Sequence, residues 1–218
     1  MRVLRYHVLP IMVVSHSHKF AFIHVPKTGG TTITHLLGKL GFTTKCSCMN
    51  HIRAGDLRAL MTPELFDSYY RFAIVRNPYD LMVSLFYFAK KSKSYRSQSG
   101  IGEEELSTFE NFMRWRSSLG HSPQVAFMTE LDDHSKEIVD KICRFEQYDR
   151  DIRSAIDAIN ARGTANPIIL PEELPTMNST QHAPWEEHYQ PGDFSALTVE
   201  YMFAADFEFF GYPTLSAK

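Results

Sequence analysis

Residues 20–34 read FAFIHVPKTGGTTIT, and this stretch decides the fold. Its first six residues are apolar and β-favouring apart from His24, which predicts a short buried strand. Pro26 cannot donate a hydrogen bond to a sheet, so the strand ends there. The glycine pair that follows permits a tight turn, and leucines at helical spacing predict a helix over about residues 31–40. The stretch therefore predicts a strand, a turn and a helix in succession.

A turn of this kind favours an anion. Backbone N–H groups and the positive end of a helix dipole point at one spot, where a phosphate or sulfate fits. Lys27 adds a mobile cation, and a threonine at position 31, 32 or 34 is expected to cap the helix. The order differs from that of phosphate-loop ATPases, in which the lysine follows the glycines. A purely structural turn is the alternative interpretation.

A second stretch, FAIVRNPYD at residues 72–80, repeats the pattern of a strand that runs into a turn, and Pro78 suits the first position of the next helix. Arg76 stands where the strand ends, and Ser84 follows two helical turns later. A guanidinium fork and a hydroxyl together suit a second phosphate. The alternatives are a structural ion pair between Arg76 and Asp80 and a core-facing serine.

These two turns together resemble those of the sulfotransferase superfamily, in particular the carbohydrate-type and bacterial branch with P-K-T-G-G-T and V-R-N-P-Y-D turns. The resemblance covers about residues 20–212. In that family the first turn binds the 5′-phosphosulfate of 3′-phosphoadenosine 5′-phosphosulfate (PAPS), and the second binds its 3′-phosphate. Carried over by position, the resemblance implies a first site of Lys27, Thr28, Gly29, Gly30, Thr31 and Thr32, and a second of Arg76 and Ser84.

The resemblance implies transfer of a sulfuryl group from PAPS to an acceptor hydroxyl on a small molecule or glycan, with a carbohydrate or similar polyol expected. The nucleotide product is adenosine 3′,5′-bisphosphate (PAP). Lys27 is the candidate for stabilising charge on the leaving phosphate, and no metal is required because lysine and backbone N–H groups offset that charge. The alternatives are a nucleotide-dependent kinase, which the lysine-first order disfavours, and a non-catalytic nucleotide- or glycan-binding module.

In-line transfer also needs a base for the acceptor hydroxyl, and the unperturbed pKa of histidine, about 6.5, suits that task. His51 is the first candidate, because it lies between the two turns and related family members carry a histidine before a similar Ala-x-x-Leu-Arg pattern. His182, His188 and Glu146 are alternatives. His24 lies inside the predicted strand and is expected to be a core residue.

The length of 218 residues and the absence of a linker rich in Ser, Gly or Pro favour one α/β domain over residues 1–218, with a central, mostly parallel sheet flanked by helices. Residues 20–212 are its expected core, and residues 1–19 an N-terminal extension or edge element. A net charge of −2 argues against a nucleic-acid-binding protein, which would need a basic face.

Three cysteines make no disulfide framework, and Cys46 and Cys48 have too few soft ligands around them in the sequence to predict a metal site. The apolar run at residues 8–14 is too short to span a bilayer, so the expectation is a cytoplasmic protein without a transmembrane segment. The sequence does not specify the oligomeric state.

The remaining elements follow from periodicity and from turn residues. Residues 90–105 are polar and predict a mobile surface loop, whose lysines are either solvated or line an anionic acceptor. Trp115, Phe145 and Tyr148 are unranked candidates for stacking on adenine, and Asn178, Ser179 and Gln181 for lining the pocket. We expect a strand at about 142–146, helices at about 78–90, 106–118, 149–161 and 194–203, and a loop at 165–176.

Overall fold

The structure is a computed structural model that describes residues 11–39, 44–45, 51–131, 133, 136–163, 165–175, 177 and 182–216. The expectations for Cys46, Cys48, Asn178, Ser179 and Gln181 lie outside these residues. The chain divides into two compact units, one made of residues 1–74 and 127–177, and the other of residues 75–126 and 178–218.

The first unit carries a sheet of strand order β3-β1-β2-β4-β5. β1 pairs antiparallel with β2 and with β3, whereas β2 and β4 are parallel, with Phe20 opposite Tyr70 and Ile23 opposite Ala73. The N–H of Asp140 donates to the carbonyl of Arg71 at 2.7 Å, so β5 begins beside the start of β4. Among the described strands β1 alone runs against the rest, which confirms a mostly parallel sheet. The strands are β1 (Ile11–Ser15), β2 (Phe20–Ile23), β3 (Thr44–Lys45), β4 (Tyr70–Val75) and β5 (Lys141–Arg144).

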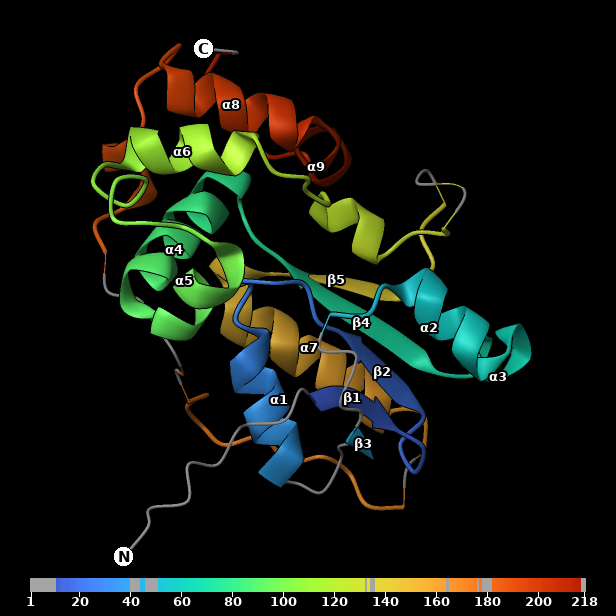
Figure 1. The fold of residues 1–218 in the computed structure, drawn as a ribbon. Coiled ribbons are helices and arrows are strands. Elements are labelled where there is room, and N and C mark those ends of the chain that lie inside the picture. The colour runs from blue at the N-terminus through green and yellow to red at the C-terminus, as the bar shows by residue number, and fades with distance from the viewer. Residues whose placement is uncertain are drawn as a thin grey trace, which may run out of the picture. The chain divides into compact units, whose positions relative to one another are not determined.

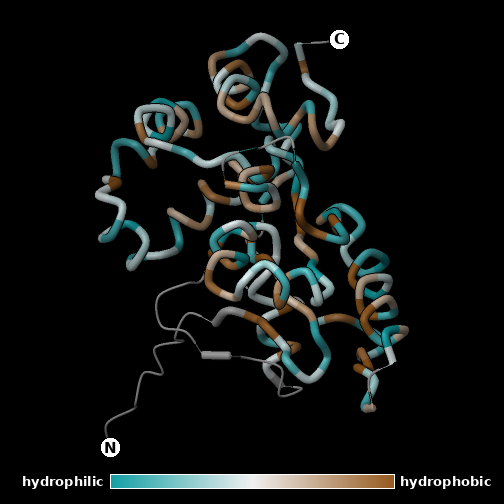
Figure 2. Tube along the Cα trace, turned by 90° about the vertical axis from the view of Figure 1, so that its right-hand side faces the viewer, coloured by the Kyte–Doolittle hydropathy of each residue, from teal (hydrophilic) through white to brown (hydrophobic). Residues whose placement is uncertain are grey.

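Two helices, α1 (Gly30–Lys39) and α7 (Tyr148–Asn160), pack on one face of this sheet (Figure 1). Alternate strand residues point to this face, because side chains along a strand alternate between its two sides. The helices meet them with residues three or four apart, the spacing of one helix face. Figure 2 shows hydrophobic and hydrophilic residues interleaved in short stretches along the chain. The buried residues of this core include Phe20, Phe22, Phe72, Ile74, Ile33, Leu37, Ile152, Ile156 and Ile159.

Two expectations for the first unit were wrong. β1 lies between β3 and β2, so residues 11–15 are an internal strand rather than an extension or an edge. Helix α1 begins at Gly30, before any of the three threonines that were expected to cap it. The shorter helices α2 (Ala54–Met61) and α3 (Pro63–Asp67) and the 3-10 turn η2 (Phe145–Gln147) complete this unit.

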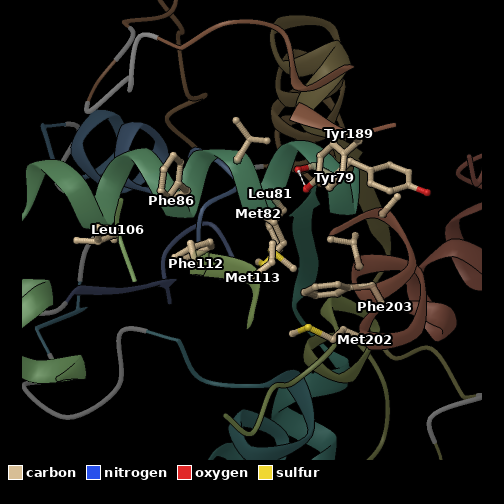
Figure 3. Packing of buried hydrophobic residues seen from close by; sticks show 14 of the residues in the cluster. Tyr79, Leu81, Met82, Phe86, Leu106, Phe112, Met113, Tyr189, Met202 and Phe203 are labelled. Atoms are coloured by element: carbon tan, nitrogen blue, oxygen red, sulfur yellow. Dashed lines mark hydrogen bonds between the residues drawn. The ribbon is translucent and has the colours of Figure 1, made fainter. Parts of the chain in front are cut away.

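The second unit is built on helix α4 (Pro78–Lys91), whose Asn77 cap accepts the N–H of Tyr79 at 3.0 Å. Its core gathers apolar side chains of several helices, and the Tyr189 hydroxyl donates to the Tyr79 carbonyl at 3.0 Å within it (Figure 3). The other described elements are α5 (Lys93–Ser99), α6 (Phe109–Ser117), η1 (Gln124–Phe127, whose last residue belongs to the first unit), η3 (Trp185–His188), α8 (Phe194–Met202) and α9 (Ala204–Phe210).

The prediction of a mobile loop over residues 90–105 was wrong, because helix α5 occupies the middle of this segment. Ser92 caps this helix by accepting the N–H of Tyr95 at 3.2 Å, and Gly100 ends it in the left-handed conformation at φ 73°. The other predicted helices form within three residues of their expected bounds. Residues 165–175 contain no helix or strand, as the three prolines there predicted.

Candidate functional site

The turn after β2 has an unusual backbone conformation. Lys27 adopts φ 66°, in the left-handed region that non-glycine residues seldom enter, and Gly29 adopts φ 80°. The hydroxyl of Thr28 is buried under the turn and donates to the carbonyl of Val25 at 2.9 Å. The N–H of Thr32 donates to the carbonyl of Gly29 at 3.0 Å. The sequence predicted the turn and its glycines but gave no signal for the left-handed lysine.

Each glycine of the turn has a neighbour that excludes a side chain. A Cβ on Gly29 would lie 2.9 Å from the ring of Tyr148 and 3.1 Å from that of Phe145. A Cβ on Gly30 would lie 2.0 Å from Cδ2 of His24, whose ring therefore rests directly against the start of α1. Gly29 is required by both its backbone and its neighbours, and Gly30 by its neighbour.

Tyr148 is tied to the turn by its hydroxyl, which donates to the carbonyl of Gly29 at 2.9 Å. Burial raises the pKa of this phenol above its ordinary value, so Tyr148 stays protonated and remains a donor. The buried Thr32 hydroxyl accepts the N–H of Met177 at 3.1 Å, whereas Thr31 is exposed. Thr28 and Thr32 thus build the turn from inside, and Thr31 is the exposed hydroxyl at the start of the helix.

Two histidines from distant positions meet beside this turn. The rings of His24 and His51 lie 4.5 Å apart between centroids, and His24 also stacks on Phe22 at 5.7 Å. Burial, and then the neighbouring His51, lower the pKa of His24 to about 3. His24 is therefore neutral at pH 7, and its half-buried ring lies against both Phe22 and the exposed His51.

His51 is held in one tautomer. Its Nδ1 lies 2.9 Å from the carbonyl oxygen of His24. A carbonyl only accepts, so Nδ1 carries the proton and Nε2 carries the lone pair. Burial lowers the pKa of His51, and its hydrogen bond to the His24 backbone raises it by less. The ring is thus mostly neutral at pH 7 and presents a proton-accepting nitrogen, which a general base requires.

In the second unit, Arg76 is largely buried, and its Nε donates to Asp80 at 2.7 Å, with the two side chains 8% and 16% exposed. The ion pair that the sequence offered as an alternative is therefore present. Two partners of the turn were not predicted. Gln124 hydrogen-bonds both backbone groups of Arg76, and the buried Asp206 holds the N–H groups of Gln124 and Val125.

The model of the sulfotransferase family matches residues 10–213, a span that includes both turns, His51 and the Asp206 segment. The chain belongs to the sulfotransferase family. No match was found among curated proteins or among solved structures.

In this sulfotransferase the alternative bases have different surroundings. His182 stacks on Tyr87 at 5.3 Å, and its Nδ1 donates to the carbonyl of Ala183 at 2.8 Å. The ring of His188 packs edge-on to Tyr87, its buried Nε2 has no hydrogen-bond partner among the described residues, and burial lowers its pKa. Glu146 lies in η2 beside Phe145.

The three candidates for stacking on adenine lie in different units of the chain. Phe145 and Tyr148 both contact Gly29 in the first unit, whereas Trp115 packs on Phe112 in the core of the second. Ser84 is a buried residue of α4.

The described residues contain no group of three or more His, Cys, Asp or Glu side chains placed to hold a metal ion. None of the described helices has the length and apolarity to cross a membrane. The expected cytoplasmic location stays a prediction.

Proposed function

We propose that this sulfotransferase moves a sulfuryl group from PAPS to a hydroxyl of a carbohydrate or similar polyol and releases PAP. The observation that carries the proposal is the turn from β2 into α1. Left-handed residues at Lys27 and Gly29 lead directly into a helix start at Gly30, and such turns form anion-binding concavities of backbone N–H groups. The family supplies the reaction class, and the turn supplies a site for an anionic group.

The residues of this turn have separable roles in the proposal. Lys27 brings a cation to the oxygen on which charge develops as the leaving phosphate departs. Gly29, Gly30 and the exposed Thr31 bring the start of α1 to the 5′-phosphosulfate. Thr28 contributes through its backbone N–H group, because its hydroxyl is engaged within the turn. Thr32 shapes the turn, since its N–H donates to the Gly29 carbonyl and its hydroxyl accepts the N–H of Met177. When bound, the donor supplies a sulfuryl group on a good leaving group.

The second turn binds the 3′-phosphate in this proposal. Arg76 offers a planar cation that matches phosphate oxygens, and Ser84 adds a hydroxyl from two turns into α4. The strands that lead into the two turns, β2 and β4, are paired in parallel with Ile23 opposite Ala73. Parallel strands end at the same edge of a sheet, which is where α/β folds bind nucleotides.

His51 is the proposed general base. Its Nε2 is the lone-pair nitrogen and accepts the proton of the acceptor hydroxyl as the oxygen–sulfur bond forms. The His24 carbonyl stays hydrogen-bonded to Nδ1–H and stabilises the imidazolium that results. The chain's own residues thus provide a cation for the leaving group and a base for the nucleophile, with no metal ion in any step.

Direct binding and transfer measurements test this proposal. We expect calorimetry to detect PAP binding without magnesium, and labelled PAPS to pass its sulfate to at least one member of a panel of glycans and polyols. Phosphate transfer from ATP with Mg²⁺, without sulfate transfer, would instead identify a kinase. Tight PAP binding without transfer to any acceptor would identify a non-catalytic nucleotide-binding module.

A further inference from the structure

Arg76 is the residue just beyond β4, and Gln124 hydrogen-bonds its backbone as a neighbouring strand would. Its Oε1 accepts the N–H of Arg76 at 2.9 Å, and its Nε2 donates to the carbonyl of Arg76 at 2.8 Å. Gln124 is 2% exposed and Arg76 is 7% exposed, so neither bond competes with bulk water. The two bonds fix the backbone at the arginine that starts the second turn.

Asp206 in turn fixes Gln124. Its two carboxylate oxygens accept the N–H groups of Gln124 and Val125, each at 2.9 Å. These are the first two residues of η1, so the carboxylate caps a helical turn from a position 82 residues along the chain. Asp206 is fully buried, and burial raises its pKa to about 6, which leaves it mostly ionised at pH 7.

The Arg76 side chain is restrained by Asp80, whose carboxylate accepts its Nε–H at 2.7 Å. Backbone and side chain of Arg76 are thus held by different partners. A guanidinium fork binds a phosphate tightly only when its direction is set in advance, because otherwise ordering the side chain offsets the gain.

We propose that Gln124 and Asp206 are positioning residues that orient Arg76 toward the 3′-phosphate of the nucleotide. This inference rests on the proposed function, in which Arg76 binds that phosphate. Neither side chain touches the ligand itself. Gln124 acts on Arg76 directly, and Asp206 acts through Gln124.

The test compares two ligands that differ by one group. Calorimetry is run with PAP and with adenosine 5′-monophosphate, which lacks the 3′-phosphate. Gln124→Met keeps the length of the side chain and removes both bonds to Arg76. We expect it to weaken PAP binding about tenfold and to leave binding of the monophosphate unchanged. Asp206→Asn, which replaces one accepting oxygen by a donor, is expected to act in the same direction.

A double-mutant cycle separates positioning from general stability. In an Arg76→Ala background, Gln124→Met should cause no further loss of PAP affinity, because the group it orients is gone. Gln98→Met is the matched control, since Gln98 is exposed on α5 and its amide donates to Ser94. If Gln124→Met fails to fold, Gln124→Glu keeps the acceptor for the Arg76 N–H and is measured in its place.

The contrary outcomes distinguish failure of the positioning role from failure of the proposed function. Wild-type PAP affinity in the Gln124 variant, beside weakened binding in Arg76→Ala, rejects the positioning role and leaves the proposed function standing. Equal weakening for both ligands, or an effect that persists without Arg76, shows a structural role only and also rejects it. Wild-type PAP affinity in Arg76→Ala removes the arginine from the donor site, and the proposed assignment fails with it.

Discussion

The Lys27 turn and the Arg76 turn offer two different solutions to the binding of an anion. The first is made of backbone, with left-handed residues at Lys27 and Gly29 and rings packed against both glycines. The second is made of side chains, with Arg76 held by Asp80 and Gln124. A backbone site fails when a Cβ is added, whereas a side-chain site fails when a polar partner is removed. The two turns should therefore respond to opposite kinds of substitution.

Loss of the Lys27 ammonium should have the largest effect. Lys27→Ala keeps a Cβ at the left-handed position, so the backbone strain is unchanged and only the cation is lost. We expect sulfate transfer from labelled PAPS to fall by about 10³–10⁵-fold, the range in which a cation at a transferring group acts. Lys19→Ala is the matched control, because Lys19 is an exposed lysine that is also left-handed, at φ 48°. Turnover retained in Lys27→Ala would refute its role.

The next largest effect should come from His51→Ala, which removes the proposed base. The rate should fall by about 10²–10⁴-fold while PAP affinity stays nearly intact, because the ring acts on the acceptor and not on the donor. His16→Ala, the loss of another exposed histidine of the first unit, should change neither quantity. A pH–rate profile like that of the wild type in His51→Ala would point to His182, His188 or Glu146.

How much of this site the sequence predicts depends on how local each feature is. The strand, the glycine turn and the helix of residues 20–39 follow from neighbouring residues, and so they were predicted. The contacts of Gln124 and Asp206 cross 48 and 82 residues, and no periodicity records them. The ring of His24 against Gly30 is likewise a packing event that a strand pattern does not reveal.

Two errors in the predicted fold have physical causes of different kinds. The prediction of an extension or edge element over residues 1–19 fails because the partners of β1 on both sides, β2 and β3, are assigned by tertiary pairing that a five-residue strand does not specify. Helix α5 was missed although local signals were present. Ser92 at its start and Gly100 at its end are typical capping residues, but the polar composition between them favoured a loop.

Removing the guanidinium from the second turn tests the side-chain solution. Arg76→Ala should weaken PAP binding by about 2–4 kcal/mol, since a charge-assisted pair to phosphate is lost. It also leaves Asp80 without its ion pair to Arg76, so the melting temperature should fall as well. Arg114→Ala removes an exposed arginine whose ion pair with Glu110 has the same spacing, and it should change neither value measurably. An unchanged PAP affinity by calorimetry would count against the assignment.

Adding one methyl group to the first turn tests the backbone solution. Gly30→Ala places a Cβ 2.0 Å from the His24 ring, and we expect the free energy of unfolding to fall by about 1–3 kcal/mol. The effect should shrink when His24→Ala is introduced first, because the obstructing ring is then absent. Gly120→Ala is the control, since no atom outside its chain neighbours lies within 4 Å of a Cβ there. A loss as large without the ring would show that the backbone, not His24, requires the glycine.

The smallest effect should be a pH dependence of stability opposite in sign to that of the second turn, where the raised pKa of Asp206 favours the folded state as the pH falls. Burial lowers the pKa of His24 to about 3, below that of an unfolded histidine near 6.5. The unfolded chain therefore binds more protons between these values, so stability is complete above pH 6.5 and declines as the pH falls. The step from pH 6.5 to 5.5 should cost about 1 kcal/mol through this group, measured by urea unfolding. His51, whose pKa is also lowered, adds a loss of the same sign. His24→Phe keeps a ring but cannot titrate, so its stability should vary less with pH than that of the wild type. An identical slope in the two proteins would mean that the His24 ring takes up protons in the folded state as readily as in the unfolded chain.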